Sequence, residues 1–226
     1  MSRSVVLLSG GLDSAVSLAY GLKTSEVELC LTFDYGQRSA AQEKRAAAAL
    51  AQYYNLKHRI IELPFLQEIT TSSLIDLNRA LPEPEAASLD NFSTASLNAA
   101  AVWVPNRNGV FINIAAAYAE ARQCELVITG FNREEAVTFP DNSLEFVAAA
   151  SNALSFSTLN KVKVISYTQQ LDKIEIINLG IRLGVPFEYI WSCYKGTEKM
   201  CGKCESCLRF KRAAEHVGLD TKSLFL

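Results

Sequence analysis

The chain has 226 residues, 49% of them hydrophobic and 20% charged, with a formal net charge of −2 at pH 7. This size and composition fit one globular domain with a small appendage, and the charge argues against a nucleic-acid partner, because nucleic-acid binders usually carry a basic excess. The apolar runs are too short to cross a bilayer and no signal-peptide pattern opens the sequence, so we expect a cytoplasmic protein without a membrane partner.

The first predicted element is a short buried strand over residues 5–8, followed by a glycine turn and a helix. Ser9-Gly10-Gly11 breaks the strand, and residues 15–20 continue as a helix. A glycine pair between strand and helix permits a tight turn and lets an anion approach the backbone N–H groups. The helix start adds unpaired amides and a positive dipole end. This pattern predicts a pyrophosphate cradle, and the alternative is an ordinary strand–turn–helix corner.

The motif Ser-Gly-Gly-Leu-Asp-Ser at residues 9–14 differs from two other phosphate loops. No Gly-Lys-Ser/Thr follows, as it would in the loop that binds β- and γ-phosphates through a lysine. No third glycine stands at the spacing of a dinucleotide-binding fold. The motif instead resembles the pyrophosphate loop (PP-loop) of the ATP pyrophosphatases, enzymes that cut ATP between its α- and β-phosphates.

Strand and helix alternate along the rest of the chain. Further strands are predicted at 27–33, 58–63, 125–130 and 162–165, and helices at 40–54, 110–122, 143–154 and from Lys173, capped by Asp172, to Gly184. This alternation predicts an α/β fold with a doubly wound parallel sheet of five strands. Residues 70–105 are rich in Ser, Asn, Pro and acidic residues, so we interpret them as an irregular mobile flap or partner-facing segment.

Four of the six cysteines cluster near the C-terminus: Cys193, Cys201, Cys204 and Cys207. Pairs separated by two residues can point at one ion from a tight turn, and Gly202 eases that turn. Four thiolates favour a closed structural zinc site with one ion per chain. An iron–sulfur cluster and a redox dithiol are the alternatives. Cys30 and Cys124 stand alone in apolar segments and are interpreted as core residues.

Four segments in this order resemble the 7-cyano-7-deazaguanine synthase family of queuosine and archaeosine biosynthesis: the glycine turn, residues 31–38, residues 104–108, and Trp191-Ser192-Cys193-Tyr194 before Cys-Gly-Lys-Cys-Glu-Ser-Cys. The resemblance extends from Val5 to Arg212. It implies an adenine nucleotide alpha hydrolase-like fold, with a PP-loop ATP-binding domain at 1–190 and a zinc-binding segment at 191–226 packed on it as one unit. It also implies a homodimer.

The activity implied by this resemblance is an ATP-dependent ligase. It would convert 7-carboxy-7-deazaguanine and ammonia to the nitrile by adenylating the carboxylate and then the amide, with ATP and Mg²⁺. The loop type favours AMP over ADP as the product. The alternatives are a PP-loop adenylating enzyme for another deazapurine or for a tRNA or protein acceptor, and a zinc-stapled nucleotide-binding module without catalysis.

The resemblance also assigns residues to the nucleotide. The expected ATP-binding residues are Leu8, Ser9, Gly10, Gly11, Leu12, Asp13, Ser14, Ala15, Val16, Ser17, Leu18, Thr32 and Phe33, and the expected catalytic residues are Asp13, Ser14, Arg107 and Lys173. Thr32 and Phe33 end a strand and face the adenine or, alternatively, only the strand interior. Arg107 is expected to hold phosphate or carboxylate, with a surface salt bridge as the alternative. Lys173 opposes the dipole of its helix, which hints at use on phosphate, although a solvated lysine fits equally.

The loop 130–143 departs from the family pattern. Familiar bacterial members carry Ser-Gly-Tyr-Pro-Asp-Cys-Arg there, whereas this chain retains only Pro140-Asp141, and Ser39 replaces a histidine elsewhere. The loop is expected to face the acceptor base. Phe131 is predicted to stack on the ring, and Asn132, Glu134 or Asp141 to accept from its N–H groups, with a solvated loop as the alternative.

Overall fold

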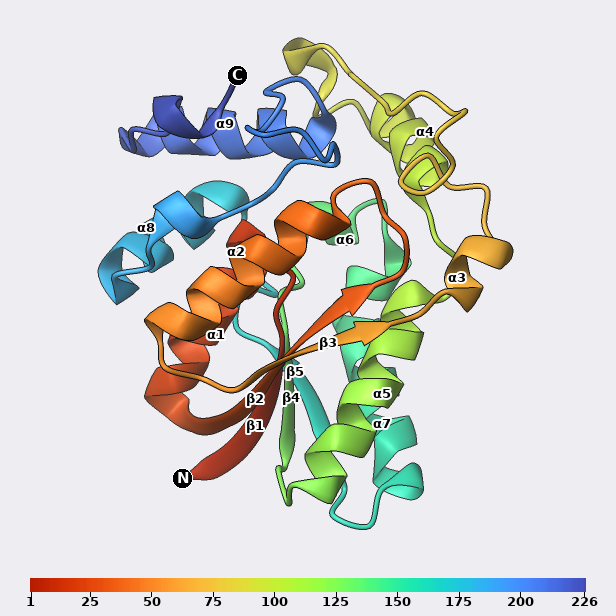
Figure 1. Ribbon diagram of the computed structural model, residues 1–226, viewed down its shortest axis with the longest axis vertical. Helices are drawn as coiled ribbons and strands as arrows, with labels where there is room; N and C mark the ends of the chain where they lie inside the picture. Colours follow the sequence, from red (N-terminus) through yellow and green to blue (C-terminus); the bar gives the residue numbers. More distant parts are fainter.

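Five parallel strands run through the centre of the computed structural model, which describes residues 1–226 (Figure 1). They are Ser2–Leu7 (β1), Ser25–Asp34 (β2), His58–Glu62 (β3), Leu126–Thr129 (β4) and Lys163–Ser166 (β5). The sheet order is β3-β2-β1-β4-β5, and every neighbouring pair is parallel. The chain winds outward from β1 to β3 and then returns to β4 and β5 on the other side. The switch point therefore lies between β1 and β4, where such sheets form a crevice beyond the strand ends.

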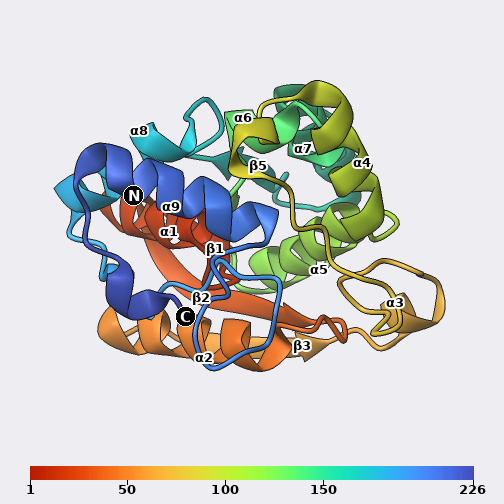
Figure 2. The same ribbon diagram turned by 90° about the horizontal axis from the view of Figure 1, so that it is seen from above.

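Helices cover both faces of the sheet. They are Leu12–Thr24 (α1), Ala40–Tyr53 (α2), Phe65–Glu68 (α3), Phe92–Val102 (α4), Arg107–Ala121 (α5), Arg133–Ala136 (α6), Leu144–Ser157 (α7), Lys173–Leu183 (α8) and Glu205–Val217 (α9). Helices α1, α2 and α8 lie on one face and α5 and α7 on the other, while α9 packs on α8 (Figures 1 and 2). The prediction of a doubly wound parallel sheet is confirmed.

Two hydrophobic cores sandwich the sheet because successive strand residues point to opposite faces. Val6 and Ile128 belong to the core under α1, whereas their neighbours Val5 and Val127 belong to the core under α5. The first core continues into the C-terminal segment, where Phe210 of α9 is buried with it. Residues after 190 are thus packed against the sheet domain through shared apolar contacts.

Two segments are more regular than the sequence suggested. The expectation of an irregular stretch over 70–105 is wrong for α4, which begins where the Asn91 side chain accepts from the Thr94 N–H at 3.0 Å. The C-terminal segment contains the amphipathic helix α9, which was not predicted. Its buried residues Cys207, Phe210 and Ala214 recur at helical spacing, but the interpretation of this segment from the sequence rests only on the metal-binding spacing of its cysteines.

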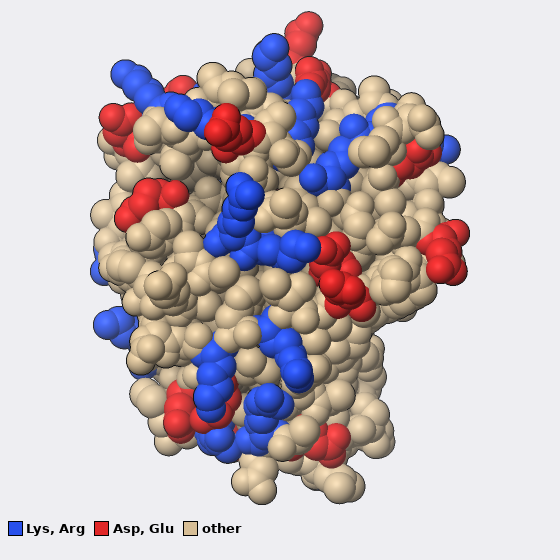
Figure 3. All heavy atoms as spheres, viewed as in Figure 1, with Lys and Arg blue, Asp and Glu red and all other residues tan.

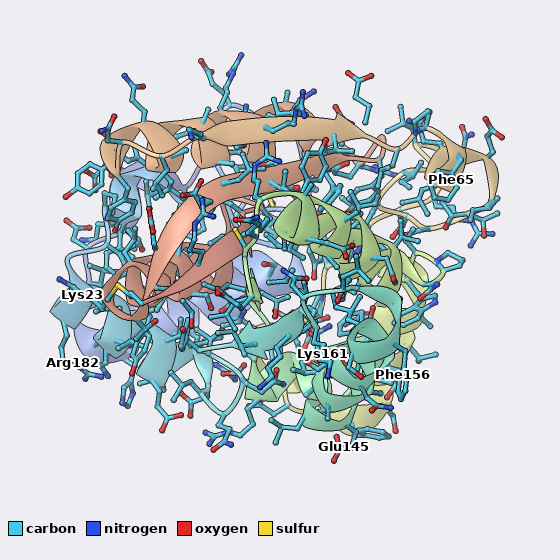
Figure 4. The ribbon with its side chains drawn as sticks, turned by 90° about the horizontal axis from the view of Figure 1, so that it is seen from below. Lys23, Phe65, Glu145, Phe156, Lys161 and Arg182 are labelled. Carbon is cyan, nitrogen blue, oxygen red and sulfur yellow. The ribbon has the colours of Figure 1, made fainter.

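The outer surface is mixed in charge. Lys and Arg side chains are interspersed with Asp and Glu over the face shown in Figure 3. Phe156 of α7 lies at the periphery of the molecule and is 86% exposed (Figure 4). None of the helices combines the length and the apolar character that a bilayer crossing would require.

Candidate active site

A cavity of about 250 Å³ opens at the carboxyl ends of β1, β2 and β4, where the switch point predicts a crevice. Its walls come from the first loop, the end of β2, the start of α5, the loop after β4 and the segment around Trp191. The sequence-predicted residues that line it are Leu8, Ser9, Gly11, Leu12, Asp13, Ser14, Phe33, Arg107, Phe131, Lys173 and Cys193.

The glycine turn needs its glycines. Gly10 has φ +83°, and a Cβ added there would lie 2.6 Å from the Ala46 Cβ and 3.0 Å from the Ala47 nitrogen. Only glycine combines that backbone conformation with that clearance. Gly11 is the N-cap of α1, and no side chain caps this helix end. The first amides of α1 therefore remain available to an anion beside the cavity.

Neighbouring groups hold the turn in place. The Ser9 Oγ accepts from the Gly11 N–H at 3.3 Å, and the Ser14 Oγ donates to the Gly11 carbonyl at 3.0 Å. The Trp191 N–H donates to the Gly10 carbonyl at 2.9 Å, so the C-terminal segment contacts the loop directly. At Gly130, after β4, an added Cβ would lie 2.6 Å from the Ser14 nitrogen, so the backbones of these two segments are in direct contact. The loop is thus supported from three elements.

A buried ion cluster lies beside the turn. The Lys173 Nζ is 2.6 Å from the Asp13 Oδ2 and 2.9 Å from the Glu135 Oε1, and the Lys173 side chain is 8% exposed. Burial raises the pKa of Asp13 to about 6, although Lys173 opposes that shift. Burial also lowers the pKa of Lys173, but the two carboxylates outweigh it and the net shift is upward. The lysine therefore stays charged between two acids at neutral pH.

One carboxylate oxygen of this cluster has no hydrogen-bond partner. The Asp13 Oδ1 is buried and has no hydrogen-bond partner. A buried carboxylate oxygen without a donor fits a hard divalent cation such as Mg²⁺, which prefers one or two carboxylates together with substrate phosphates. Sequence reasoning identified Asp13 and Lys173 but missed Glu135, which stands next to Glu134 on α6.

Aromatic side chains and an arginine form the opposite wall of the cavity. Arg107, the first residue of α5, donates from Nη1 to the Tyr35 hydroxyl at 3.0 Å, and its Nε has no partner. Arg107 forms no salt bridge, so the alternative of a surface salt bridge is not supported. Burial lowers its pKa, but Tyr35 and Asp141 outweigh that effect and the pKa is raised. Phe33 and Phe111 stack with ring centroids 4.2 Å apart.

Some predicted ATP-binding residues support the loop from behind. Thr32 is 1% exposed; its hydroxyl donates to the Leu8 carbonyl and lies 2.7 Å from the His58 Nε2. It therefore lies outside the cavity lining, whereas Phe33 beside it lines the cavity. Ala15, Val16, Ser17 and Leu18 are buried in α1. Their contribution is to hold the helix start against the sheet.

The loop after β4 brings only one of its four predicted acceptor residues to the cavity. Phe131 lines it and lies edge-on to Phe146, with ring centroids 6.2 Å apart. Asn132 is fully buried and caps α6 by accepting from the Glu135 N–H at 3.0 Å. Asp141 accepts from the Asn142 side chain at 3.1 Å and lies outside the lining.

The fourth, Glu134, serves the junction between helices. Its Oε1 accepts from the Lys173 backbone N–H at 2.8 Å, and its Oε2 from Arg209 of α9 at 3.0 Å. Both oxygens are therefore bound within the protein, outside the cavity lining. Glu43 and Tyr35 line the cavity and were not predicted, although Tyr35 lies in one of the segments that carry the resemblance.

The four clustered cysteines come together. Their sulfur atoms lie within 4.8 Å of one another, all four residues are buried, and none forms a disulfide. A tetrahedral zinc ion with Zn–S bonds of about 2.3 Å would place its sulfurs about 3.8 Å apart. Backbone N–H groups of Lys195, Cys201, Lys203 and Cys204 donate to these sulfurs at 3.3–3.4 Å. The donor set fits a metal ion held by thiolates.

Known proteins resemble this chain over nearly its full length. Residues 3–218 match the family model "Queuosine biosynthesis protein QueC". A "7-cyano-7-deazaguanine synthase" of Pelotomaculum thermopropionicum is 66% identical over 96% of this chain and 99% of the relative. One of Methanosarcina mazei is 43% identical over 96% of this chain and 95% of the relative. Among solved structures, a 4-thiouridine synthetase–RNA complex with bound ATP shares the fold, with a TM-score of 0.51, 18% identity, and coverage of 96% of this chain and 50% of that one.

Proposed function

Because the chain belongs to the QueC family of queuosine biosynthesis proteins, we propose that it is a ligase converting 7-carboxy-7-deazaguanine and ammonia to 7-cyano-7-deazaguanine at the expense of ATP. The observation that carries this proposal is the open glycine turn beside Asp13 and Lys173 in one cavity, in a chain 66% identical to a protein of that name. The fold and the arrangement of these residues support an adenylating reaction.

The chemistry explains why such a loop is needed. A carboxylate is a poor electrophile, because its leaving group would be oxide. Attack of its oxygen on the α-phosphorus of ATP releases pyrophosphate and gives an acyl adenylate, from which ammonia displaces AMP to form the amide. A second ATP activates the amide oxygen in the same way, and loss of AMP and a proton leaves the nitrile. The protein contributes positioning and charge stabilisation.

Each part of the cavity has a role in this scheme. The amides at the start of α1 hold the phosphates that leave as pyrophosphate. Lys173 stabilises the negative charge that grows on them, and Asp13 presents its free oxygen to magnesium, which neutralises phosphate charge when bound. Arg107 is free to bind the carboxylate or the α-phosphate with its guanidinium.

The cysteine cluster has a structural role in this proposal. The four thiolates would hold a zinc ion in a closed site and would leave no open position for substrate. Zinc would fix the segment from which Trp191 bonds to the glycine turn. We place the enzyme in the cytoplasm, where the free thiols stay reduced. We also propose a homodimer, for which the exposed apolar side chains Phe156 and Leu159 offer a contact surface.

The direct test is a reaction with defined components. Purified protein with ATP, magnesium, ammonium and 7-carboxy-7-deazaguanine should give a product with the mass of the nitrile, together with AMP and pyrophosphate. Omitting ammonium should prevent both amide and nitrile formation. Unchanged acceptor in the complete mixture, with zinc-loaded and folded protein, would overturn the proposal.

A further inference from the structure

Two opposite charges line the cavity without forming a salt bridge. Asp13 and Glu135 share the ammonium of Lys173, whereas Glu43 and Arg107 form no salt bridge. A carboxylate removed from bulk water and left without a cation costs free energy unless other donors satisfy it. Glu43 and Arg107 attract each other across the cavity without forming an ion pair, so both keep hydrogen-bonding capacity that a ligand can use.

The Glu43 carboxylate is held in place by neutral donors only. The Ser39 hydroxyl donates to Oε1 at 2.5 Å, and the Gln37 Nε2 donates to Oε2 at 2.9 Å. Gln37 is itself fixed, because its Oε1 accepts from the Tyr35 N–H at 2.9 Å and its Nε2 also donates to the Phe33 carbonyl at 3.1 Å. A carboxylate offers about four acceptor positions, so each oxygen retains a lone pair. Burial raises the pKa of Glu43, and these two hydrogen bonds and the charge of Arg107 oppose the shift.

The surroundings suit a flat ring. Phe33, Tyr35, Phe111 and Phe131 all line the same cavity as Glu43. Aromatic faces bind planar heterocycles by offset or edge-on stacking, and they leave hydrogen bonding to the edge of the ring. A ligand with a planar ring, adjacent N–H donors on one side and an anionic group on the other would stack on these rings. Its donors would bind the free lone pairs of Glu43, and its anionic group would bind Arg107.

We propose that Glu43 recognises the acceptor base, accepting hydrogen bonds from the ring N–H and the exocyclic amine of its guanine-like edge, while Arg107 binds the carboxylate to be activated. This inference rests on the proposed function and names the residue that selects its substrate. Two adjacent N–H donors match the two oxygens of one carboxylate. Glu43 thereby takes the role that the sequence assigned to Asn132, Glu134 and Asp141.

The test combines a variant with a substrate analogue. Glu43→Gln should lower kcat/KM for 7-carboxy-7-deazaguanine by about 10- to 100-fold, the range for hydrogen bonds to a charged group, and leave the KM for ATP unchanged. For the wild type, the analogue lacking the exocyclic amine should suffer a loss of similar size. Glu43→Gln should discriminate little further against that analogue, because the partner of the missing amine is already gone.

Asp34→Asn is the matched control, since Asp34, at the end of β2, is also an acid near this part of the chain but is already paired with Lys44. It should leave the kinetics of both acceptors unchanged, and thermal unfolding of both variants should show that they fold. The inference is overturned if the losses from Glu43→Gln and from the analogue multiply independently, or if the KM for ATP rises instead. A wild-type protein that forms no nitrile at all would instead refute the proposed function.

Discussion

Asp13 and Lys173 lie 160 residues apart in the chain, yet the Asp13 Oδ2 and the Lys173 Nζ are 2.6 Å apart. The contact joins the first turn of α1 to the first residue of α8, on either side of the switch point. It places a cation beside the glycine turn, although a lysine at a helix start is locally unfavourable. Two carboxylates offset that local cost, and the predictions below depend on this arrangement.

Replacing Lys173 with Met should abolish most activity and weaken the fold. Nitrile formation should fall by about 100-fold or more, the typical effect of removing one preorganised group that stabilises developing charge. The free energy of unfolding at pH 7 should fall by about 3 kcal/mol, because the largely buried Asp13 and the partly exposed Glu135 lose their shared cation. Steady-state kinetics and urea denaturation measure the two effects. Lys44→Met, which breaks the more exposed pair with Asp34, should cost less than about 1 kcal/mol and leave turnover intact.

The pKa of Asp13 predicts how stability changes with pH. Its folded pKa of about 6 exceeds the ordinary value of 3.8 for an aspartate, so between these values the native state binds more protons than the unfolded state. Stability from this group is therefore greatest below pH 4 and is lost as pH rises toward 6. Relative to Asp13→Asn, the wild type should lose stability over that window and show a constant difference above it. Parallel curves of unfolding free energy across pH 4–6 would contradict the assignment.

The same group predicts an acidic limit to activity. Ionised Asp13 is the form proposed to bind magnesium, so kcat/KM for ATP should fall below an apparent pKa of about 6. A pH–rate profile with saturating acceptor measures it. A flat profile down to pH 5, in protein that remains folded, would remove Asp13 from the catalytic step.

Gly10→Ala should be far more damaging than Gly184→Ala. Both glycines have positive φ, at +83° and +69°, and the left-handed conformation costs alanine about 1–2 kcal/mol. At Gly184 a new methyl group meets nothing within 4 Å, whereas at Gly10 it meets Ala46 and the Ala47 backbone. Gly10→Ala should therefore lose about 3 kcal/mol or more and also lose ATP binding. Calorimetry measures the stability of the two variants and titration measures their ATP binding. Equal losses in both variants would contradict this prediction.

Cys204→Ser should release the metal and lower the melting temperature, because a thiolate site contributes directly to folding. Metal analysis should give about one zinc per chain in the wild type and much less in the variant. Cys30→Ala is the control, since Cys30 is equally buried but lies outside the cluster. It should keep its metal. Iron in place of zinc, or well under one ion in the wild type, would exclude the zinc assignment.

The sequence predicted those parts of the site that depend on local backbone rules. The glycine turn follows from strand–glycine–helix punctuation, and Asp172 does cap α8, with Glu175 completing a capping box. Lys173 was identified because its charge opposes the helix dipole. Strand periodicity already implies that only one of Thr32 and Phe33 faces the cavity, although the pattern did not say which.

The rest of the site depends on how distant elements dock. Glu134 and Glu135 are neighbours on one short helix, and only the packing of α6 against α8 and α9 decides that Glu135 faces Lys173 while Glu134 meets Arg209. Glu43 lies in a charged, alanine-rich helix that gives no sign of a cavity. The roles of these residues depend on tertiary packing, so spacing rules within a single segment cannot predict them.

The hydrogen bond from the Trp191 N–H to the Gly10 carbonyl joins two segments that lie far apart in the sequence, so the first is synthesised well before the second. During translation the emerging glycine turn lacks this support until the cysteine-bearing tail has been synthesised and folded back. A chain that lacks the segment around Trp191 would have a less constrained glycine turn, so this contact couples the turn to the folding of the cysteine-bearing segment.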